Sequence, residues 1–421
     1  MHIELVNLAG REVASLDAGE SWTIAELAPQ LQGLSTDPLV RVRVFFNFAE
    51  LSGKTTLAEV GASDGAQLQA VVDTHRLVVT ASDDHSARIW SADTGECLAT
   101  LAGHSDVVMT AVFSPDGSQV LSASKDRTAL LWDVNSGACI AKFEGHRGSV
   151  ISAGFAPDGS HVITASRDST ARIWDTRTGA CEHSLAGHAD RVMSAMFSPS
   201  GEVAVTASRD GKVKLWSPSS GKCIRTLSGH RASVVSALFS PDGAEVLSAS
   251  RDCTAKVWNA TSGELVMTID GHRCWLESAV YSPDGTQLLT SSGDCSAKLW
   301  DKASVGCLFT FGGHDAAVTS AMFSPDGARV LTVSINCNVR LWNTCTGQCL
   351  TSFEAHVASV AAAAFSADGT EVYSASKDGT ARVWCTETGA CLQVLQGHGD
   401  WVRSVALATS ERRMLPAANG A

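Results

Sequence analysis

Histidine, serine or threonine, and aspartate recur together along this chain at fixed spacing. His104, Ser122 and Asp126 form the first complete set. These are the residue types of a hydrolytic triad, in which a carboxylate orients a histidine that takes a proton from a hydroxyl. An active site needs one such set, whereas this one repeats along the chain, each aspartate position being followed by a tryptophan, here Trp132. A buried indole N–H can only donate and requires an acceptor. We therefore predict that the sets are structural and that the protein is not an enzyme.

The tryptophans define the repeat that positions these sets. They recur every 42 residues, and a Gly-His dipeptide follows each one at a fixed distance, with Ala355 replacing the glycine once. A period of about 40 to 45 residues with these signatures resembles the WD40 repeat. The resemblance covers residues 74 to about 408. The eight tryptophans are Trp90, Trp132, Trp174, Trp216, Trp258, Trp300, Trp342 and Trp384.

The resemblance implies that each set closes into a hydrogen-bonded tetrad. In WD40 proteins these bonds join the Gly-His histidine, a Ser or Thr of the second strand, the Asp of the next turn and the Trp of the third strand. The first unit has Thr80, Asp84 and Trp90 but no preceding histidine, and His398 is left over at the other end. Asn336 replaces one aspartate and cannot hold a charge, so we expect that tetrad to be the weakest.

Each repeat unit predicts four short strands, which form one blade of a propeller. Counting the units gives eight blades, and the last innermost strand, residues 401–408, has no strands after it. We expect it to return beside residues 78–82, so that both ends build one blade. Residues 67–72 are an alternative partner for that edge, but the leftover His398 favours the C-terminal strand. Residues 409–421 are predicted to be a flexible tail, and the propeller spans 74–408.

Residues 1–73 lack the repeat and form a separate predicted domain. They read as strand, strand, helix, strand, strand, with alternating apolar residues at 1–5 and 40–44 and a helical face at 24–31. MHIELVNLAG, TIAEL and AQLQAVV resemble ubiquitin and its beta-grasp relatives, although no Gly-Gly terminus follows Val72. The resemblance implies a fused α+β module with an exposed apolar patch of Leu8, Phe45 and Val71. Alternatively, Phe45 packs on the propeller.

Net charge, hydropathy and cysteine spacing limit which partners the protein binds and where in the cell it resides. The net charge of -12 argues against nucleic acid, which is bound through clustered Lys and Arg. Neither a secretory signal nor a membrane span is written in the sequence, so we predict a cytoplasmic protein, with the nucleus as a second possibility. Seven of the thirteen cysteines follow the 42-residue period and lie a blade apart, beyond disulfide reach. We expect reduced, buried thiols, and no metal site or cofactor.

Basic and aromatic residues gather at the loops that carry the Gly-His pair and the turn aspartate. Before that aspartate, five of eight units have Lys or Arg. Arginine at this place, within Ser-Arg-Asp, also resembles F-box WD40 receptors of phosphorylated degrons, whose second arginine set is matched here by Arg403 alone. A rim of this kind suits an acidic or phosphorylated peptide, and the alternative is a solvated rim. The candidate residues are Lys125, Arg167, Arg209, Arg251 and Lys377 before the aspartate, Arg191, Trp275 and Trp401 three residues past the histidine, and Arg403.

We interpret the chain as a mainly β, non-catalytic interaction scaffold, a monomeric subunit of a larger complex whose partners are other proteins. One alternative keeps the propeller but makes the protein a substrate receptor or adaptor in the ubiquitin system. Another is an adaptor for ciliary dynein arms, whose repeats share phrases such as GACLQVLQGH at residues 389–398.

Overall fold

The computed structural model describes residues 76–354 and 356–408 with their side chains. Of the preceding residues it describes the backbone of five strands, within 2–74. The chain divides into two compact units, of which the second is Leu77–Thr409. Among the described residues, no helix has the length and apolar character that a membrane crossing requires.

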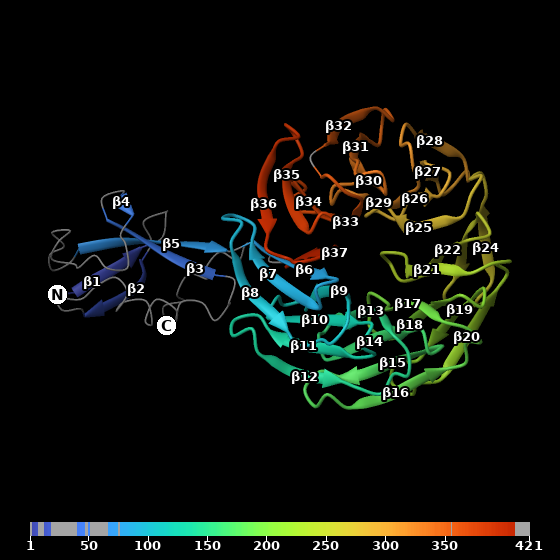
Figure 1. The fold of residues 1–421 in the computed structure, drawn as a ribbon, viewed down its shortest axis with the longest axis horizontal. Helices are drawn as coiled ribbons and strands as arrows, with labels where there is room; N and C mark the ends of the chain where they lie inside the picture. The colour runs from blue at the N-terminus through green and yellow to red at the C-terminus, as the bar shows by residue number, and fades with distance from the viewer. Residues whose placement is uncertain are drawn as a thin grey trace. The chain divides into compact units, whose positions relative to one another are not determined.

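The second unit is a ring of eight four-stranded antiparallel sheets, which confirms the predicted number of blades (Figure 1). In seven blades the strands follow one another along the chain, from the innermost to the outermost. Blade 2 is β9 (Val108–Phe113), β10 (Gln119–Ser124), β11 (Ala129–Asp133) and β12 (Cys139–Phe143); blade 3 is β13 (Val150–Phe155), β14 (His161–Ser166), β15 (Thr170–Asp175) and β16 (Cys181–Ala186); blade 4 is β17 (Val192–Phe197), β18 (Ala204–Ser208), β19 (Lys212–Trp216) and β20 (Cys223–Ser228); blade 5 is β21 (Val234–Phe239), β22 (Glu245–Ser250), β23 (Ala255–Asn259) and β24 (Leu265–Ile269). Blade 6 is β25 (Leu276–Tyr281), β26 (Gln287–Ser292), β27 (Ala297–Asp301) and β28 (Cys307–Phe311); blade 7 is β29 (Val318–Phe323), β30 (Arg329–Ser334), β31 (Val339–Asn343) and β32 (Cys349–Phe353); blade 8 is β33 (Val360–Phe365), β34 (Glu371–Ser376), β35 (Thr380–Cys385) and β36 (Cys391–Gln396).

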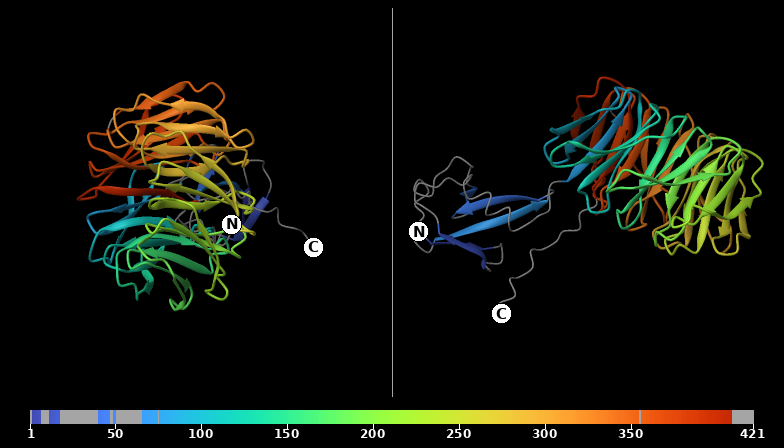
Figure 2. Two further views of the ribbon diagram at one scale, coloured as in Figure 1. Left: turned by 90° about the vertical axis from the view of Figure 1, so that its right-hand side faces the viewer. Right: turned by 90° about the horizontal axis from the view of Figure 1, so that it is seen from below.

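Blade 1 joins the two ends of the propeller. Its strands are β37 (Val402–Leu407), β6 (Leu77–Ser82), β7 (Ser86–Ser91) and β8 (Cys97–Ala102), and β37 pairs antiparallel with β6. In Figure 1 and Figure 2 the red strand β37 accordingly lies beside the blue strands of the first repeat. The C-terminal strand therefore closes the ring, as predicted, and the innermost place of blade 1 is occupied by β37.

The hydrophobic core lies between neighbouring blades. One cluster, for example, joins Ile163 and Leu185 of blade 3 to Val192 and Trp216 of blade 4. The second strand of each blade is buried over almost its whole length, which explains why these strands read as continuous apolar or small residues. Because blades 3 to 8 each contribute to two such clusters, the core continues from blade 2 round to blade 1. At the closure, Val402 and Val405 of β37 pack with Leu395 of blade 8.

The outermost strands correct one prediction. We expected the periodic cysteines to be buried, but all seven are exposed, and they are free thiols, as expected. The fourth strand of a blade has no further strand beside it, and in most blades only its fifth residue, such as Leu101 or Phe143, turns into the core. The second residue of this strand is exposed for the same reason, although it is aliphatic in seven blades: Leu98, Ile140, Ile224, Val266, Leu308, Leu350 and Leu392.

The first unit contains a five-stranded sheet in the order β2-β1-β5-β3-β4. Its strands are β1 (His2–Val6), β2 (Glu12–Asp17), β3 (Val40–Phe46), β4 (Ala49–Glu50) and β5 (Ala66–Thr74). β5 pairs parallel with β1 and antiparallel with β3, so residues 67–72 belong to this sheet. Phe45 lies in β3 and Val71 in β5. The predicted helix, Leu8 and the tail at 409–421 lie outside the described residues.

Candidate functional site

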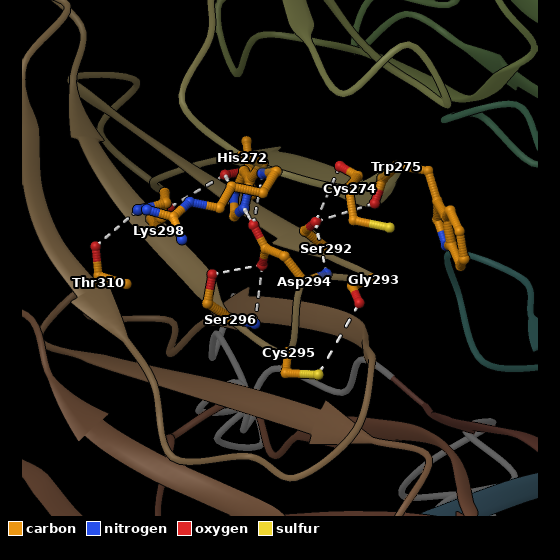
Figure 3. Close-up of polar contacts among 12 residues, drawn as sticks. His272, Cys274, Trp275, Ser292, Gly293, Asp294, Cys295, Ser296, Lys298 and Thr310 are labelled. Carbon is orange, nitrogen blue, oxygen red and sulfur yellow. Dashed lines mark hydrogen bonds and ion pairs between the residues drawn. The ribbon is translucent and has the colours of Figure 1, made fainter.

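The tetrad of blade 6 shows how the repeated polar residues are held, and Figure 3 draws its His272 and Asp294. The Trp300 Nε1–H donates to Thr290 Oγ1 at 2.9 Å, and the Thr290 hydroxyl lies 2.8 Å from His272 Nε2. His272 Nδ1 lies 2.8 Å from Asp294 Oδ2, so the network assigns the proton to Nδ1. The chain of bonds thus runs from the third strand, through the second, to the turn. It ties the Gly-His loop to the blade it precedes.

The same bonds recur in the first complete set and at the closure. Trp132 donates to Ser122 at 2.8 Å, and His104 lies 2.8 Å from both Ser122 and Asp126. In blade 1, Trp90 donates to Thr80 at 2.8 Å. His398, the histidine without a set of its own, lies 2.7 Å from Thr80 Oγ1 and 2.8 Å from Asp84 Oδ2. The structure therefore assembles the eighth tetrad from residues at opposite ends of the chain.

Burial of the hydroxyl, rather than the protonation state of the histidine and aspartate, makes the tetrads poor candidates for catalysis. Burial opposes ionisation of Asp294, but hydrogen bonds from Ser296, the Arg273 amide and His272 lower its pKa to about 2. Burial also lowers the pKa of His272, against the opposing effect of Asp294. At neutral pH the pair is thus a neutral imidazole and a carboxylate. Thr290 is fully buried and already bonded to both Trp300 and His272, so no substrate reaches its hydroxyl.

Blade 7 departs from this pattern at one position. Asn336 replaces the aspartate, and among the described residues neither Asn336 Oδ1 nor His314 Nδ1 has a hydrogen-bond partner, although both are buried. Burial, together with the Arg340 guanidinium, lowers the pKa of His314 to about 4. Trp342 still donates to Thr332, which in turn contacts His314. The tetrad of blade 7 therefore keeps the bonds that join Trp342, Thr332 and His314, and it lacks the bond between the histidine and the turn residue.

Four of the basic residues occupy the same place in four successive blades. We call Lys125, Arg167, Arg209 and Arg251 the basic rim. The backbone N–H of each donates to the carbonyl of the residue three past the Gly-His histidine, at 2.8 to 2.9 Å. The three arginines are exposed, and Lys125 is half-buried. The four side chains therefore extend from equivalent turns of blades 2 to 5.

Among the described residues, one member of the basic rim, Arg209, forms a salt bridge. Arg209 faces Asp190, with Nε 3.8 Å from Oδ2 and about half of each side chain exposed. Such an exposed pair contributes at most about 1 kcal/mol. Arg191, whose carbonyl accepts from the Arg209 N–H, is also exposed. Among the described acidic residues, no salt bridge is found to Lys125, Arg167 or Arg251.

The other predicted site residues of the propeller lie outside the basic rim. Trp401, Arg403 and Lys377 meet at the junction of blades 8 and 1. There the Arg403 guanidinium pairs with Asp83 through Nε and, at 2.7 Å, through Nη2, so that charge is already matched. Trp275, in blade 6, is separated from them. The predicted residues of the propeller thus fall into the basic rim and two groups, one around Trp401 and one around Trp275.

Sequence reasoning missed one cluster of ligand-type side chains. His161, Asp175 and Glu182 bring one ligand atom each within 4.8 Å of the others. They come from three neighbouring strands, β14, β15 and β16, so no short motif announces them. His161 is already bonded, through Nδ1 to Ser160 at 2.6 Å and through Nε2 to Glu182 at 3.1 Å. His161 and Glu182 therefore already bond each other, while Asp175 accepts from Thr178.

The comparison with known families matches this geometry. The family model of the WD domain, G-beta repeat, covers seven segments, which together make up more than half of the chain: residues 95–133, 137–175, 179–217, 221–259, 263–301, 305–343 and 347–385. WD40 propellers are generally non-catalytic scaffolds for protein interactions. The eighth repeat is the one split between residues 77–91 and 398–407, where β37 completes blade 1. With seven matched repeats, each bearing its tryptophan, and an eighth assembled from both ends, the chain belongs to the WD40 repeat family.

Proposed function

We propose that the propeller is an interaction scaffold whose basic rim binds an acidic or phosphorylated segment of a partner protein. The observation that carries this proposal is the row of Lys125, Arg167, Arg209 and Arg251 in four successive blades of a chain whose net charge is -12. Cations from equivalent turns present a row of donors to one extended ligand. Each charge-assisted hydrogen bond to a phosphate or carboxylate contributes roughly 1.5 to 3 kcal/mol.

Charge reversal tests this proposal. The triple variant Arg167→Glu, Arg209→Glu and Arg251→Glu is compared with the native protein for binding to an immobilised array of peptides, each in phosphorylated and unmodified form. We expect the native protein to retain a subset of the phosphorylated peptides and the variant to lose that subset. Native retention should also weaken as the salt concentration rises, since exposed charges are screened.

A matched control keeps the same change in net charge away from the basic rim. Lys142, Arg177 and Lys222 are exposed residues of blades 2 to 4 that lie in or shortly before outermost strands. Their reversal to Glu should leave the retained peptides unchanged. Equal loss in both triple variants would point to net charge alone, and retention by the rim variant would refute the basic rim as the binding site.

We further propose that residues 1–73 form the ubiquitin-like module, with an apolar patch of Leu8, Phe45 and Val71 as a second docking surface. The strands of the first unit support this, because β1, β2, β3 and β5 fall where the resemblance expects them. In that case the protein would serve as an adaptor in the ubiquitin system, the propeller selecting the substrate. Isothermal titration of purified ubiquitin receptors against native and Leu8→Ala/Phe45→Ala protein tests this, and equal affinities would refute it.

A further inference from the structure

Two tryptophans occupy the same position in different blades, so their surroundings can be compared directly. Trp275 and Trp401 each stand three residues past a Gly-His histidine and directly before an innermost strand, β25 or β37. Both side chains are exposed, at 45% and 42%, unlike the tetrad tryptophans. The other six blades have Val107, Ser149, Arg191, Ser233, Ala317 and Ser359 at this position.

The ring of Trp401 is covered by a cation of the protein itself. The Lys377 ammonium, from the turn of the preceding blade, lies 4.4 Å from the centroid of the ring. Arg403 lies 6.0 Å from the same centroid and pairs with Asp83 across the blade. Distances below about 6 Å place an ammonium in the attractive field of an aromatic face. This corner therefore contains its own cationic ligand and its own matched charges.

The corner around Trp275 differs in charge at two of these positions. Glu277 stands where Arg403 stands in blade 1, and Gly293 stands where Asp83 stands. The Trp275 Nε1–H donates to Glu277 Oε1 at 2.8 Å, which fixes the edge of the ring beside a carboxylate. Figure 3 shows this indole apart from the hydrogen-bonded cluster of His272, Ser292 and Asp294.

The indole of Trp275 packs against Gly293. A Cβ at this position would lie 2.7 to 3.1 Å from three ring atoms, so a side chain there would push the ring away. One side of the ring therefore packs on the glycine backbone, while almost half of the residue remains exposed. Among the described lysines and arginines, none lies over this ring, and this includes Arg251, which holds the place of Lys377.

We propose that Trp275 and Glu277 form a subsite for a protonated lysine or arginine side chain of a partner protein. The ring supplies its negative face and Glu277 a carboxylate at its edge, and both attract a cation. The contact between Lys377 and Trp401 shows the same interaction formed within the chain. This subsite takes the charge opposite to that taken by the basic rim and does not depend on the proposed function. A segment bound to both would carry an acidic group followed or preceded by a basic one.

The subsite is tested with the full chain labelled with 5-fluorotryptophan and observed by fluorine NMR. The eleven tryptophan signals are assigned by single Trp→Phe variants. The probe is n-butylammonium, which reproduces the end of a lysine side chain, and n-butanol is the uncharged control. We expect the Trp275 signal to shift in a saturable manner with n-butylammonium and not with n-butanol. An equal response to both compounds, or none to the cation, would overturn the proposal.

Two variants separate the subsite from general surface effects. Glu277→Gln keeps the shape of the side chain and should weaken binding at Trp275 by about two- to fivefold, the effect of an exposed ion pair. Lys377→Met should make the Trp401 signal respond to n-butylammonium, since the covering cation is removed. Unchanged affinity in Glu277→Gln would contradict the role of the carboxylate. Because the probe carries no anionic group, failure of the phosphopeptide experiment leaves this result unaffected.

Discussion

Replacing Asn336 with aspartate should complete the one imperfect tetrad and stabilise the propeller. In the native protein Asn336 Oδ1 and His314 Nδ1 are both buried without a partner among the described residues. An aspartate would accept the Nδ1–H of His314, as Asp294 does from His272 at 2.8 Å in blade 6. It would also lie near the Arg340 guanidinium that now lowers the pKa of His314.

The size of the effect follows from the bond that is gained. A hydrogen bond to a charged group contributes about 1.5 to 3 kcal/mol. For a cooperative unit of roughly 330 residues, the unfolding entropy per residue converts this to a rise in Tm of about 2 to 4 °C. Calorimetry at pH 7 measures it. Gln348→Glu is the matched control, since it adds the same charge in the same blade at an exposed residue outside the tetrad.

The pH dependence of the Tm difference gives a second, independent signature. In the native protein the pKa of His314 is lowered to about 4, so the unfolded chain takes up a proton first and stability falls as pH drops from about 6.5 to 4. In Asn336→Asp the new carboxylate raises the pKa of His314 and reduces that fall. The advantage of the variant should therefore be larger at pH 5 than at pH 7.

Below pH 4 the same variant should lose its advantage. The new carboxylate should have a depressed pKa, as Asp294 has at about 2, so its contribution is present above the unfolded pKa of about 4 and lost as pH falls through the folded value. A Tm that is unchanged at pH 7, or a gain equal to that of Gln348→Glu, would refute the assignment of the tetrad as the source of stability.

Three further predictions concern other parts of the propeller. His398→Ala removes the bonds of this histidine to Thr80 and Asp84, which join the loop before β37 to blade 1, and it should lower the free energy of unfolding by about 1 to 3 kcal/mol, measured by urea titration; an unchanged midpoint would contradict this. The seven exposed periodic thiols and the exposed Cys345 should react with Ellman's reagent in the absence of denaturant, whereas fewer than eight accessible thiols would mean that the outermost strands are covered. Gly293→Ala should displace the Trp275 ring and move its fluorine signal without cation present, and an unmoved signal would disprove the close packing.

The periodicity was sufficient to predict much of the propeller, because seven of its eight tetrads use residues within one blade spacing. The unmatched His398 and the incomplete first set pointed to the same closure that β37 and β6 make. The exposure of the cysteines was mispredicted because apolar character was taken as burial. An outermost strand has only one neighbour, so most of its side chains face solvent whatever their polarity.

Side-chain contacts that occur at a single place in the ring could not be read from the repeat. The stacking of Lys377 on Trp401 and the pairing of Arg403 with Asp83 depend on which side chains meet at one junction. The repeat gives their positions, but the partner of each charge is decided by rotamers and by the neighbouring blade. Arg403 accordingly resembled a ligand-binding arginine in the sequence, whereas in the structure its charge is matched internally.

The pairing of β6 with β37 has a consequence for synthesis on the ribosome. Thr80 and His398 are 318 residues apart, so at 5 to 20 residues per second the first strand waits roughly 15 to 60 s for its partner. During that time the nascent blade 1 presents an unpaired edge, which is a template for wrong pairing with another chain. Chaperone demand during translation should therefore persist until the final repeat has emerged, and it should end abruptly when it does.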